Sequence, residues 1–518
     1  WSGPLGTMGA ASGKWYWEIL PQQALGASGS GWQGIVGDNA SRFWDGVDTP
    51  QGTAGILYNQ AGNKDIEGTQ STYGDTFTTG DIIGVALNMD DSEVTFYKNN
   101  VAQASGVAIA FSGDIANATF VTSASSLYNS TSYFNFGSDS SFSGEKTAQG
   151  NTDGNGIGDF YYAPPSGFKA LCTSNLPTPS IKLPGKHFNT ILWDGDGVSP
   201  TSMTGVGFQP DLVWSKARQD TWAHALADAV RGSENTIWAN TTAADDDYYI
   251  WGYVSAFDSD GFTVTAGASG IQAWNDSTDI FVAWNWLGDG VDGGTLNEDG
   301  SEPSQVNVNT TAGFSIATIP SYSGNITFGH GLSAAPTCVI MKALTGIDQW
   351  TVGHSGMGDW GKGLSLNNTA AEDSNATFFN STEPDASIVN LGAWDAGYTR
   401  VVYSFHSVEG YSKVDSYEGN GDADGTFIYT GFRPAFFLLK NSNTTDSWRL
   451  YDSKRLGFNV ENELLVPNTN AIEGSVVAVD FLSNGFKVRS SEGGINGSGN
   501  TVCYLAFAES PFKYANAR

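Results

Sequence analysis

The sequence predicts an all-β protein, and two features of the chain support this prediction. Glycine occupies 65 of 518 positions, so that glycine or proline interrupts almost every window before a helix could complete its ~10 residues. Short segments rich in β-branched and aromatic residues recur between turns of Gly, Asn, Asp or Ser, at 14–19, 82–87, 94–99, 262–266 and 427–432. Many short strands with frequent turns are typical of β-sandwiches and jelly rolls. The one exception is 214–232, where apolar residues at helical spacing predict a short helix.

Composition and charge exclude several classes of protein. The chain has 24 Lys plus Arg against 54 Asp plus Glu, a net charge of −30, whereas nucleic-acid binding needs a concentrated cationic surface. Aromatic residues make up 13% of the chain, too many for a disordered protein. The longest apolar runs are far shorter than the ~20 residues that span a bilayer. We therefore expect no nucleic acid and no membrane as partners. The three cysteines lie far apart in strand-like text, which predicts buried thiols.

The second part of the chain repeats itself. Residues 193–216 align without a gap on 417–440, and the same offset of 224 places 257–264 on 481–488. A divergent third copy at 329–342 keeps a six-residue step from proline to lysine, which ends at Lys216, Lys342 and Lys440 in the three copies. This third copy contains no evident counterpart of the segment 257–264. The sequence thus predicts three related β-units.

A proline-rich stretch at 173–185 precedes these units, and because proline fixes φ we expect a semi-rigid connector there. We predict four domains. The first is a sandwich over 1–175. Three β-repeats follow, at 176–288 with the connector, at 289–409 as the divergent copy, and at 410–518.

The N-terminal segment resembles a known family. It contains GKWYWEI (13–19), GDIIGVALN followed by VTFYKNN within 73–100, and a closing YFNFG (133–137). Asp and Ser between the two middle runs predict a hairpin turn. This order of motifs is similar to the SPRY family over about residues 10–170, which implies a concanavalin-like sandwich of two antiparallel sheets. The resemblance does not extend to the peptide-binding members, so no peptide ligand is implied.

The repeats resemble the β-rich virion proteins of tailed bacteriophages, in particular tail-fibre and other virion-surface proteins. The segments that carry this resemblance are 417–440, GHGLSAAP (329–336), SDGFTV (259–264) and 504–518. It implies an extracellular location on the virion surface and contact with other virion proteins. It also implies a homo-oligomer, commonly a trimer. The resemblance provides no catalytic residues.

Aromatic residues in glycine-rich text are candidates for ligand binding. Trp32, Trp44 and Asp45 lie in GSGWQGIVGDNASRFWDG, which is typical of a loop. An indole stacks on the C–H face of a sugar and a nearby carboxylate adds a directional polar contact, so these residues predict a site for a host-surface glycan. The alternative interpretation is that such tryptophans close the end of a sandwich.

Acidic loops are candidates for Ca²⁺ binding, because this cation prefers clustered oxygen ligands. Asp194 and Asp196 lie in DGDG, and Asp422 and Asp424 lie in NGDADG. The second loop resembles the first half of an EF-hand, but its twelfth position is Gly431 rather than a glutamate. Asp-Gly is also common hairpin-turn chemistry, so plain turns are the alternative. We predict no other cofactor and no resident metal beyond this candidate.

The sequence offers no catalytic set. Glycoside hydrolysis needs two carboxylates about 5 to 9.5 Å apart, and Glu18 stands alone on its predicted strand. No GxSxG or HExxH motif is present. We therefore expect a non-enzymatic virion protein, a tail fibre or a capsid-attached fibre or decoration, that contributes adhesion to a host glycan. The alternatives are a purely architectural virion protein, and a secreted carbohydrate-active enzyme or lectin.

Overall fold

The computed structural model of the protein describes residues 5–22, 31–37, 54–118, 121–127, 131–245, 248–373, 378–393, 396–456 and 458–515. Over these ranges the chain is all-β, as predicted, and it divides into two compact units, Trp1–Pro177 and Thr178–Arg518. No helix within them has the length and hydropathy needed to cross a bilayer. The helical elements are single turns: α1 (Gln272–Asn275), α2 (Gly493–Asn496), η1 (Gln103–Gly106), η2 (Gly113–Asn117), η3 (Thr173–Asn175), η4 (Pro184–Lys186), η5 (Tyr248–Trp251), η6 (Ser355–Met357) and η8 (Phe512–Tyr514).

The N-terminal unit is a sandwich of two sheets whose strands pair antiparallel, except that the short β13 pairs parallel with β2. One sheet has the order β1 (Leu5–Ala10), β11 (Val121–Leu127), β3 (Gly31–Gly37), β4 (Gly55–Asn59), β5 (Asn63–Ile66) and β6 (Thr69–Thr72). The other has the order β10 (Ile109–Ala110), β8 (Glu93–Lys98), β7 (Ile83–Asn88), β2 (Lys14–Pro21) and β12 (Ser132–Asn135), with β13 (Lys169–Ala170) beside β2 and β9 (Val101–Ala102) beside β8. The predicted hairpin is confirmed, because β7 pairs with β8 from Asn88↔Glu93 onward.

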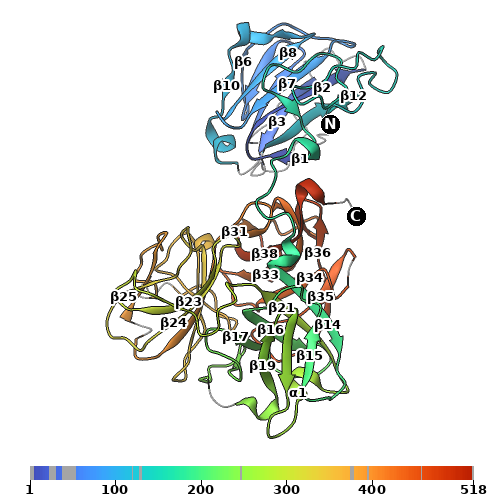
Figure 1. Cartoon of the computed structure of the whole chain (residues 1–518). Helices are drawn as coiled ribbons and strands as arrows, with labels where there is room; N and C mark the ends of the chain where they lie inside the picture. The colour runs from blue at the N-terminus through green and yellow to red at the C-terminus, as the bar shows by residue number, and fades with distance from the viewer. Residues whose placement is uncertain are drawn as a thin grey trace. The chain divides into compact units, whose positions relative to one another are not determined.

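The C-terminal unit consists of three lobes (Figure 1), each made of a central sheet and an outer sheet; the central sheet has more strands in the first two lobes, and both sheets have four strands in the third. In the first lobe the central sheet is β14 (Phe188–Asp194), β21 (Ile280–Trp286), β16 (Leu212–Ala217), β17 (Ala225–Asp228) and β18 (Ile237–Trp238), and the outer sheet is β15 (Thr201–Thr204), β20 (Gly261–Thr265) and β19 (Tyr253–Asp258). In the second lobe the central sheet is β22 (Thr295–Asn297), β23 (Ser304–Asn309), β24 (Phe314–Ile319), β30 (Arg400–Phe405), β26 (Cys338–Ala343), β27 (Thr351–His354) and β28 (Leu364–Ser365), and the outer sheet is β25 (Ile326–Gly329) and β29 (Ile388–Leu391). In the third lobe the central sheet is β31 (Ser412–Glu418), β38 (Thr501–Pro511), β33 (Phe432–Asn441) and β34 (Arg449–Asp452), and the outer sheet is β32 (Phe427–Tyr429), β37 (Gly485–Val488), β36 (Gly474–Leu482) and β35 (Glu461–Leu464).

The inner strands β16, β26 and β33 of the central sheets are buried on both faces. In β33, Phe437 and Leu439 face the third lobe's own outer sheet, whereas Phe436 and Leu438 belong to a core that all three lobes share. The corresponding strands of the other lobes, β16 and β26, alternate between two cores in the same way. The sequence of a strand that is buried on both faces is a continuous apolar run, because neither face needs polar side chains. The three repeats are therefore one compact unit.

The predicted duplication is visible in the pairing of the outer sheets. The hairpins β19–β20 and β36–β37 place Phe257 opposite Phe262 and Phe481 opposite Phe486, at the sequence offset of 224. The divergent second copy forms a shorter outer sheet of two strands. The short helix predicted within 214–232 is wrong, since that segment forms β16 and β17, which pair with each other. Burial on both faces of a sheet outweighed the helical spacing.

The three lobes close a ring through equivalent backbone hydrogen bonds. The N–H of Asp245 in the first lobe donates to Leu344 O in the second, at 3.0 Å. The N–H of Glu372 in the second lobe donates to Ser442 O in the third, at 2.7 Å, and the N–H of Glu473 in the third lobe donates to Arg218 O in the first, at 2.8 Å. Leu344, Ser442 and Arg218 each lie two residues after the repeated lysine. One chain thus builds a ring with approximate three-fold symmetry.

Candidate functional site

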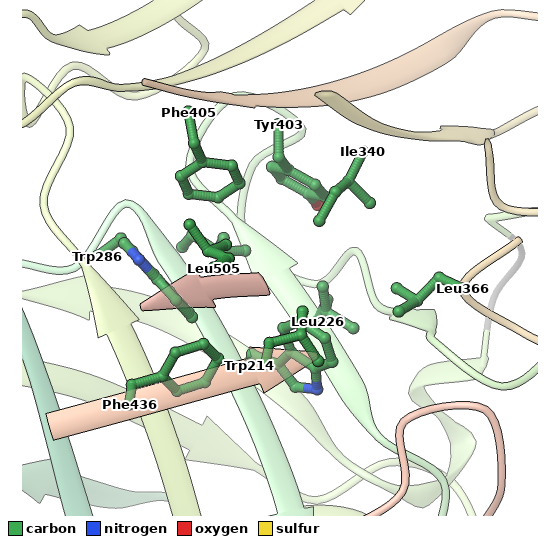
Figure 2. Close-up of a pocket in the computed structure, with 11 residues that line it drawn as sticks. Trp214, Leu226, Trp286, Ile340, Leu366, Tyr403, Phe405, Phe436 and Leu505 are labelled. Atoms are coloured by element: carbon green, nitrogen blue, oxygen red, sulfur yellow. The ribbon is translucent and has the colours of Figure 1, made fainter. Parts of the chain in front are cut away.

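The centre of the ring is filled by side chains from all three lobes. Figure 2 shows Trp286, Tyr403 and Phe436, one from each lobe, directed toward the same region. The cavity among these apolar residues has a volume of only about 10 Å³, which is at the lower limit for one water molecule. Aromatic rings surround it closely, for example Trp286 and Phe436 at 5.6 Å between centroids. This centre is a packed core and has no room for a ligand.

The repeated lysines are buried beside that core. Lys216, Lys342 and Lys440 are each 0% exposed, and burial lowers the pKa of each to about 8. Such lysines are candidate nucleophiles in enzymes. Here the ammonium groups donate to main-chain carbonyls instead: Lys216 to Asp220 O at 2.8 Å and Lys440 to Asn441 O at 2.6 Å. Lys342 donates to Ala343 O at 3.1 Å and also reaches Thr242 O of the first lobe, at 3.2 Å. Their equivalent places in three lobes indicate a structural role.

A surface groove on the C-terminal unit offers the space that the centre lacks. It has a volume of about 590 Å³ and lies where η4, the end of β38 and η8 meet. Its lining residues are Lys182, Leu183, Pro184, Gly185, Lys186, Glu509, Ser510 and Tyr514. Ligand pockets typically have volumes of 300 to 1,000 Å³. Among the described residues, this groove is the best candidate for a binding site.

Both charged and apolar groups line the groove. The side chains of Lys182 and Lys186 are exposed, and the ammonium of Lys186 donates to Gly207 O at 3.1 Å. Glu509 accepts from Arg433 Nε at 2.8 Å, so its charge is matched within the protein. Leu183 and Tyr514 are 67% and 45% exposed. The arrangement suits a ligand that carries negative charge and an apolar face.

Sequence reasoning missed this groove. Lys182 lies in the proline-rich stretch that predicted only a connector, Lys186 directly follows that stretch, and Tyr514 lies more than 300 positions away. The available signal for this groove was the occurrence of two lysines in a five-residue segment of a strongly acidic chain.

Of the tryptophans predicted to bind a glycan, the structure describes Trp32 only; Trp44 and Asp45 lie outside the described residues. The predicted loop position of Trp32 is wrong. Trp32 belongs to strand β3, which pairs with β11 and β4, and its side chain is 1% exposed beside Val36 and Leu57. Glycine-rich text predicted a loop, but pairing of β3 on both edges placed the indole in a core.

The predicted Ca²⁺ ligands use their oxygens within the protein. Asp196 accepts from Asn275 Nδ2 at 2.6 Å and from the N–H of Val198 at 2.9 Å. Asp422 accepts from the N–H of Asp424, whose own carboxylate pairs with Lys487 at 2.8 Å. Asp194 ends strand β14. No group of three or more potential metal ligands occurs in the part of the chain that the structure describes. The alternative interpretation, plain turns, fits these contacts.

Glu18 is fully buried and fastens a later segment to the N-terminal sandwich. It accepts from the N–H groups of Tyr161 at 2.8 Å and Tyr162 at 2.7 Å, and from Asn135 Nδ2 at 3.2 Å. Burial raises the pKa of Glu18 to about 7 despite these hydrogen bonds. A raised carboxyl pKa is a common feature of general acids. The side chain of Glu18 is 0% exposed, however, so its hydrogen bonds indicate a structural role rather than that of a general acid.

The predicted buried thiols are free cysteines. Cys338 and Cys503 are buried in the shared core, and Cys172 is half-buried in the N-terminal unit.

Comparison with known families identifies both units. A family model described as "Domain of unknown function (DUF7483)" matches residues 183–511, more than half of the chain. The chain belongs to the DUF7483 family. The SPRY domain model matches residues 14–139, so that the N-terminal unit of this DUF7483 protein is a SPRY domain, a concanavalin-like β-sandwich as predicted. The comparisons give no support for the resemblance to tail-fibre proteins.

Solved structures resemble the chain over about a quarter of its length. The SPRY domain of human HERC1 is 20% identical, with a TM-score of 0.21, and the match covers 25% of this chain and 76% of that one. A human SPRY domain is 14% identical, with a TM-score of 0.20 and coverage of 26% and 82%. Stonustoxin is 18% identical, with a TM-score of 0.20 and coverage of 26% and 20%. No curated protein matches the chain.

Proposed function

We propose that this protein is a non-enzymatic component of a virion surface, a phage tail fibre or a capsid-attached fibre or decoration, that contributes adhesion to a host-surface glycan. The observation that carries the proposal is the closed ring of three lobes. The three repeated lysines are buried and donate to main-chain carbonyls, and the space that the ring offers to a ligand is an open surface groove. This arrangement suits recognition better than chemistry, because catalysis needs ionisable groups aimed at a reacting atom.

The charge of the chain also supports an exterior location. A net charge of −30 keeps particles that display many copies soluble and mutually repelling. Other virion proteins are the expected partners.

Imaging and glycan binding together test this proposal. Antibody against the protein should label the surface of intact particles in electron microscopy, and the purified full chain should bind a subset of surface glycans on an array. Absence of the label from particles would contradict the proposal. Labelled particles with no glycan binding by the chain would leave the architectural alternative, which the closed ring of three lobes also fits. Breakdown of host polysaccharide by the purified chain would establish the enzyme alternative instead.

The homotrimer stays a separate prediction. Ring closure places a three-fold arrangement inside one chain, so a trimer would have to use surfaces outside the ring. Sedimentation of the full chain distinguishes a monomer from a homotrimer, since the trimer has three times the monomer mass of 54.8 kDa.

A further inference from the structure

We propose that the groove formed by η4, β38 and η8 binds an acidic saccharide, with its anionic group at Lys182 and Lys186 and a sugar ring against Tyr514. This inference deepens the proposed adhesion function and rests on it. It places the contact in the C-terminal unit rather than at the tryptophans of the SPRY domain.

The cations of the groove are the first observation. Neither Lys182 nor Lys186 forms an ion pair with a described residue, although the chain carries 54 carboxylate side chains against 24 cationic ones. An anion that contacts both ammonium groups gains Coulomb energy that a single exposed lysine would not provide. Two unpaired lysines in one groove of so acidic a protein therefore favour an anionic ligand.

The single carboxylate of the lining does not cancel this preference. Glu509 is matched by Arg433, whose side chain is only 3% exposed and which also donates to Phe481 O at 2.9 Å. That pair is fixed by the fold of the third lobe. The two lysines keep a net positive charge toward a ligand.

The apolar lining favours a saccharide over an acidic peptide. The phenol ring of Tyr514 presents a flat apolar surface with a hydroxyl at its edge, and the nearby Leu183 adds exposed aliphatic surface. Sugar C–H faces pack on such a surface and sugar hydroxyls bond to its polar rim. A peptide commonly adds to a free strand edge. Here Pro184 and Pro511 have no N–H to donate at the turns that border the groove.

Titration calorimetry on the full chain tests the proposal with three named probes. These are tetrasaccharides of hyaluronan and of heparin, which are acidic, and the neutral tetramer of N-acetylglucosamine. We expect at least one acidic probe to bind, at least tenfold more tightly than the neutral one. We also expect the binding to weaken as NaCl rises from 50 to 500 mM, because salt screens exposed charges.

Variants locate the binding to the groove. The double variant Lys182→Gln with Lys186→Gln should lose at least tenfold in affinity for the acidic probe, and Tyr514→Ala about fivefold. Lys454→Gln, an exposed lysine of the third lobe that does not line the groove, should leave the affinity unchanged.

Three outcomes would overturn the inference: no binding of either acidic probe, unchanged affinity in the double variant, or equally tight binding of poly-glutamate. Adhesion of the labelled full chain to host cells separates this inference from the proposed function. Adhesion that survives the double variant refutes the groove and leaves the function standing, whereas absence of any adhesion refutes both.

Discussion

The three interfaces of the ring are equivalent in backbone geometry but differ in the side chains that close them. Eight residues after the repeated lysine, Trp350 of the second lobe donates to Trp238 O of the first at 3.0 Å, and Trp448 of the third donates to Ser365 O of the second at 2.8 Å. The first lobe has His224 at this position, and its Nε2 has no partner among the described residues. The tryptophan eight residues after the lysine is thus missing where the third lobe meets the first, an interface that we call the seam.

Ion pairs close the seam instead. Arg218 of the first lobe pairs with Glu473 at 2.7 Å and with Glu463 at 3.0 Å, both in the third lobe. Glu473 also pairs with the fully buried Arg455 at 2.7 Å. Asp452 of the third lobe, twelve residues after Lys440, accepts a hydrogen bond across the seam from Trp284 Nε1 of the first lobe, at 3.1 Å. The seam joins the two ends of the repeated sequence, so the difference shows that one fold can close an interface by apolar burial or by matched charge.

The largest effect is expected where an indole closes the interface. Trp350→Ala removes a fully buried ring and should lower the free energy of unfolding of the C-terminal unit by about 3 to 5 kcal/mol, through lost burial and the cavity left behind. Trp448→Ala should have a similar effect. Urea unfolding followed by circular dichroism measures both. A loss below about 1 kcal/mol in either variant would show that indole burial does not hold these interfaces.

A smaller, salt-dependent effect is expected at the seam. Glu473→Gln should lower the free energy of unfolding by about 2 kcal/mol, because Arg218 and Arg455 lose a charged acceptor. The difference from the wild type should shrink in 1 M NaCl, whereas that of Trp350→Ala should not. Glu383→Gln, at an exposed position of the second lobe, is the matched control. Equal salt dependence in the tryptophan and glutamate variants would erase the distinction between the interfaces.

A rise in pH from acid to neutral should weaken the third lobe beside the seam. Burial raises the pKa of Glu461 to about 8, above its unfolded value near 4.5, and the nearby Asp452 raises it further. The folded state then holds a proton that the unfolded state releases, so the free energy of unfolding falls as pH rises from about 4.5 to 8. Glu461→Gln should remove this slope and gain at least about 1 kcal/mol on the wild type between pH 5 and 8. Urea titrations at several pH values measure it, and parallel curves would contradict the assignment.

His354 provides the opposite sign at the interface of the second and third lobes. It contacts Tyr504 O at 3.1 Å, and burial lowers its pKa to about 4. Only the unfolded state binds the proton between pH 4 and 6.5, so this group makes the free energy of unfolding fall on acidification.

The smallest effect is expected at His224. Its Nδ1 accepts a hydrogen bond from Trp214 Nε1 at 3.1 Å, while its Nε2 is buried without a hydrogen-bond partner among the described residues. His224→Phe loses the first bond but also removes the unpaired group, so the free energy of unfolding should change by about 1 kcal/mol or less. Urea unfolding beside Trp350→Ala measures the contrast. A loss as large as that of the tryptophan variant would mean that His224 closes the seam after all.

Much of the strand pattern could be predicted from the sequence. Alternation and turn residues located the hairpin β7–β8, and the offset of 224 located the equivalent hairpins of the first and third lobes. These features are local, or repeat a local pattern. The segment 214–232 was misread because an apolar run buried on both faces carries no periodicity that separates strand from helix.

The candidate site was beyond the reach of the sequence. Trp32 looked like a loop residue, but only the pairing of β3 with its neighbours decides that it is buried. The groove joins Lys182 and Tyr514 through the folding of the whole C-terminal unit.

The sequence by itself determined the β class, the SPRY motifs and the three copies with their lysines, because backbone propensity and repeat spacing are written in neighbouring residues. Tertiary structure alone decided that the copies close a ring around one core. It also decided that ion pairs of Arg218 take the place of the tryptophan eight residues after the lysine at one interface, and that two distant segments make a groove. The physical reason is that burial and pairing depend on which surfaces meet, and a strand that is apolar on both faces does not specify its second partner.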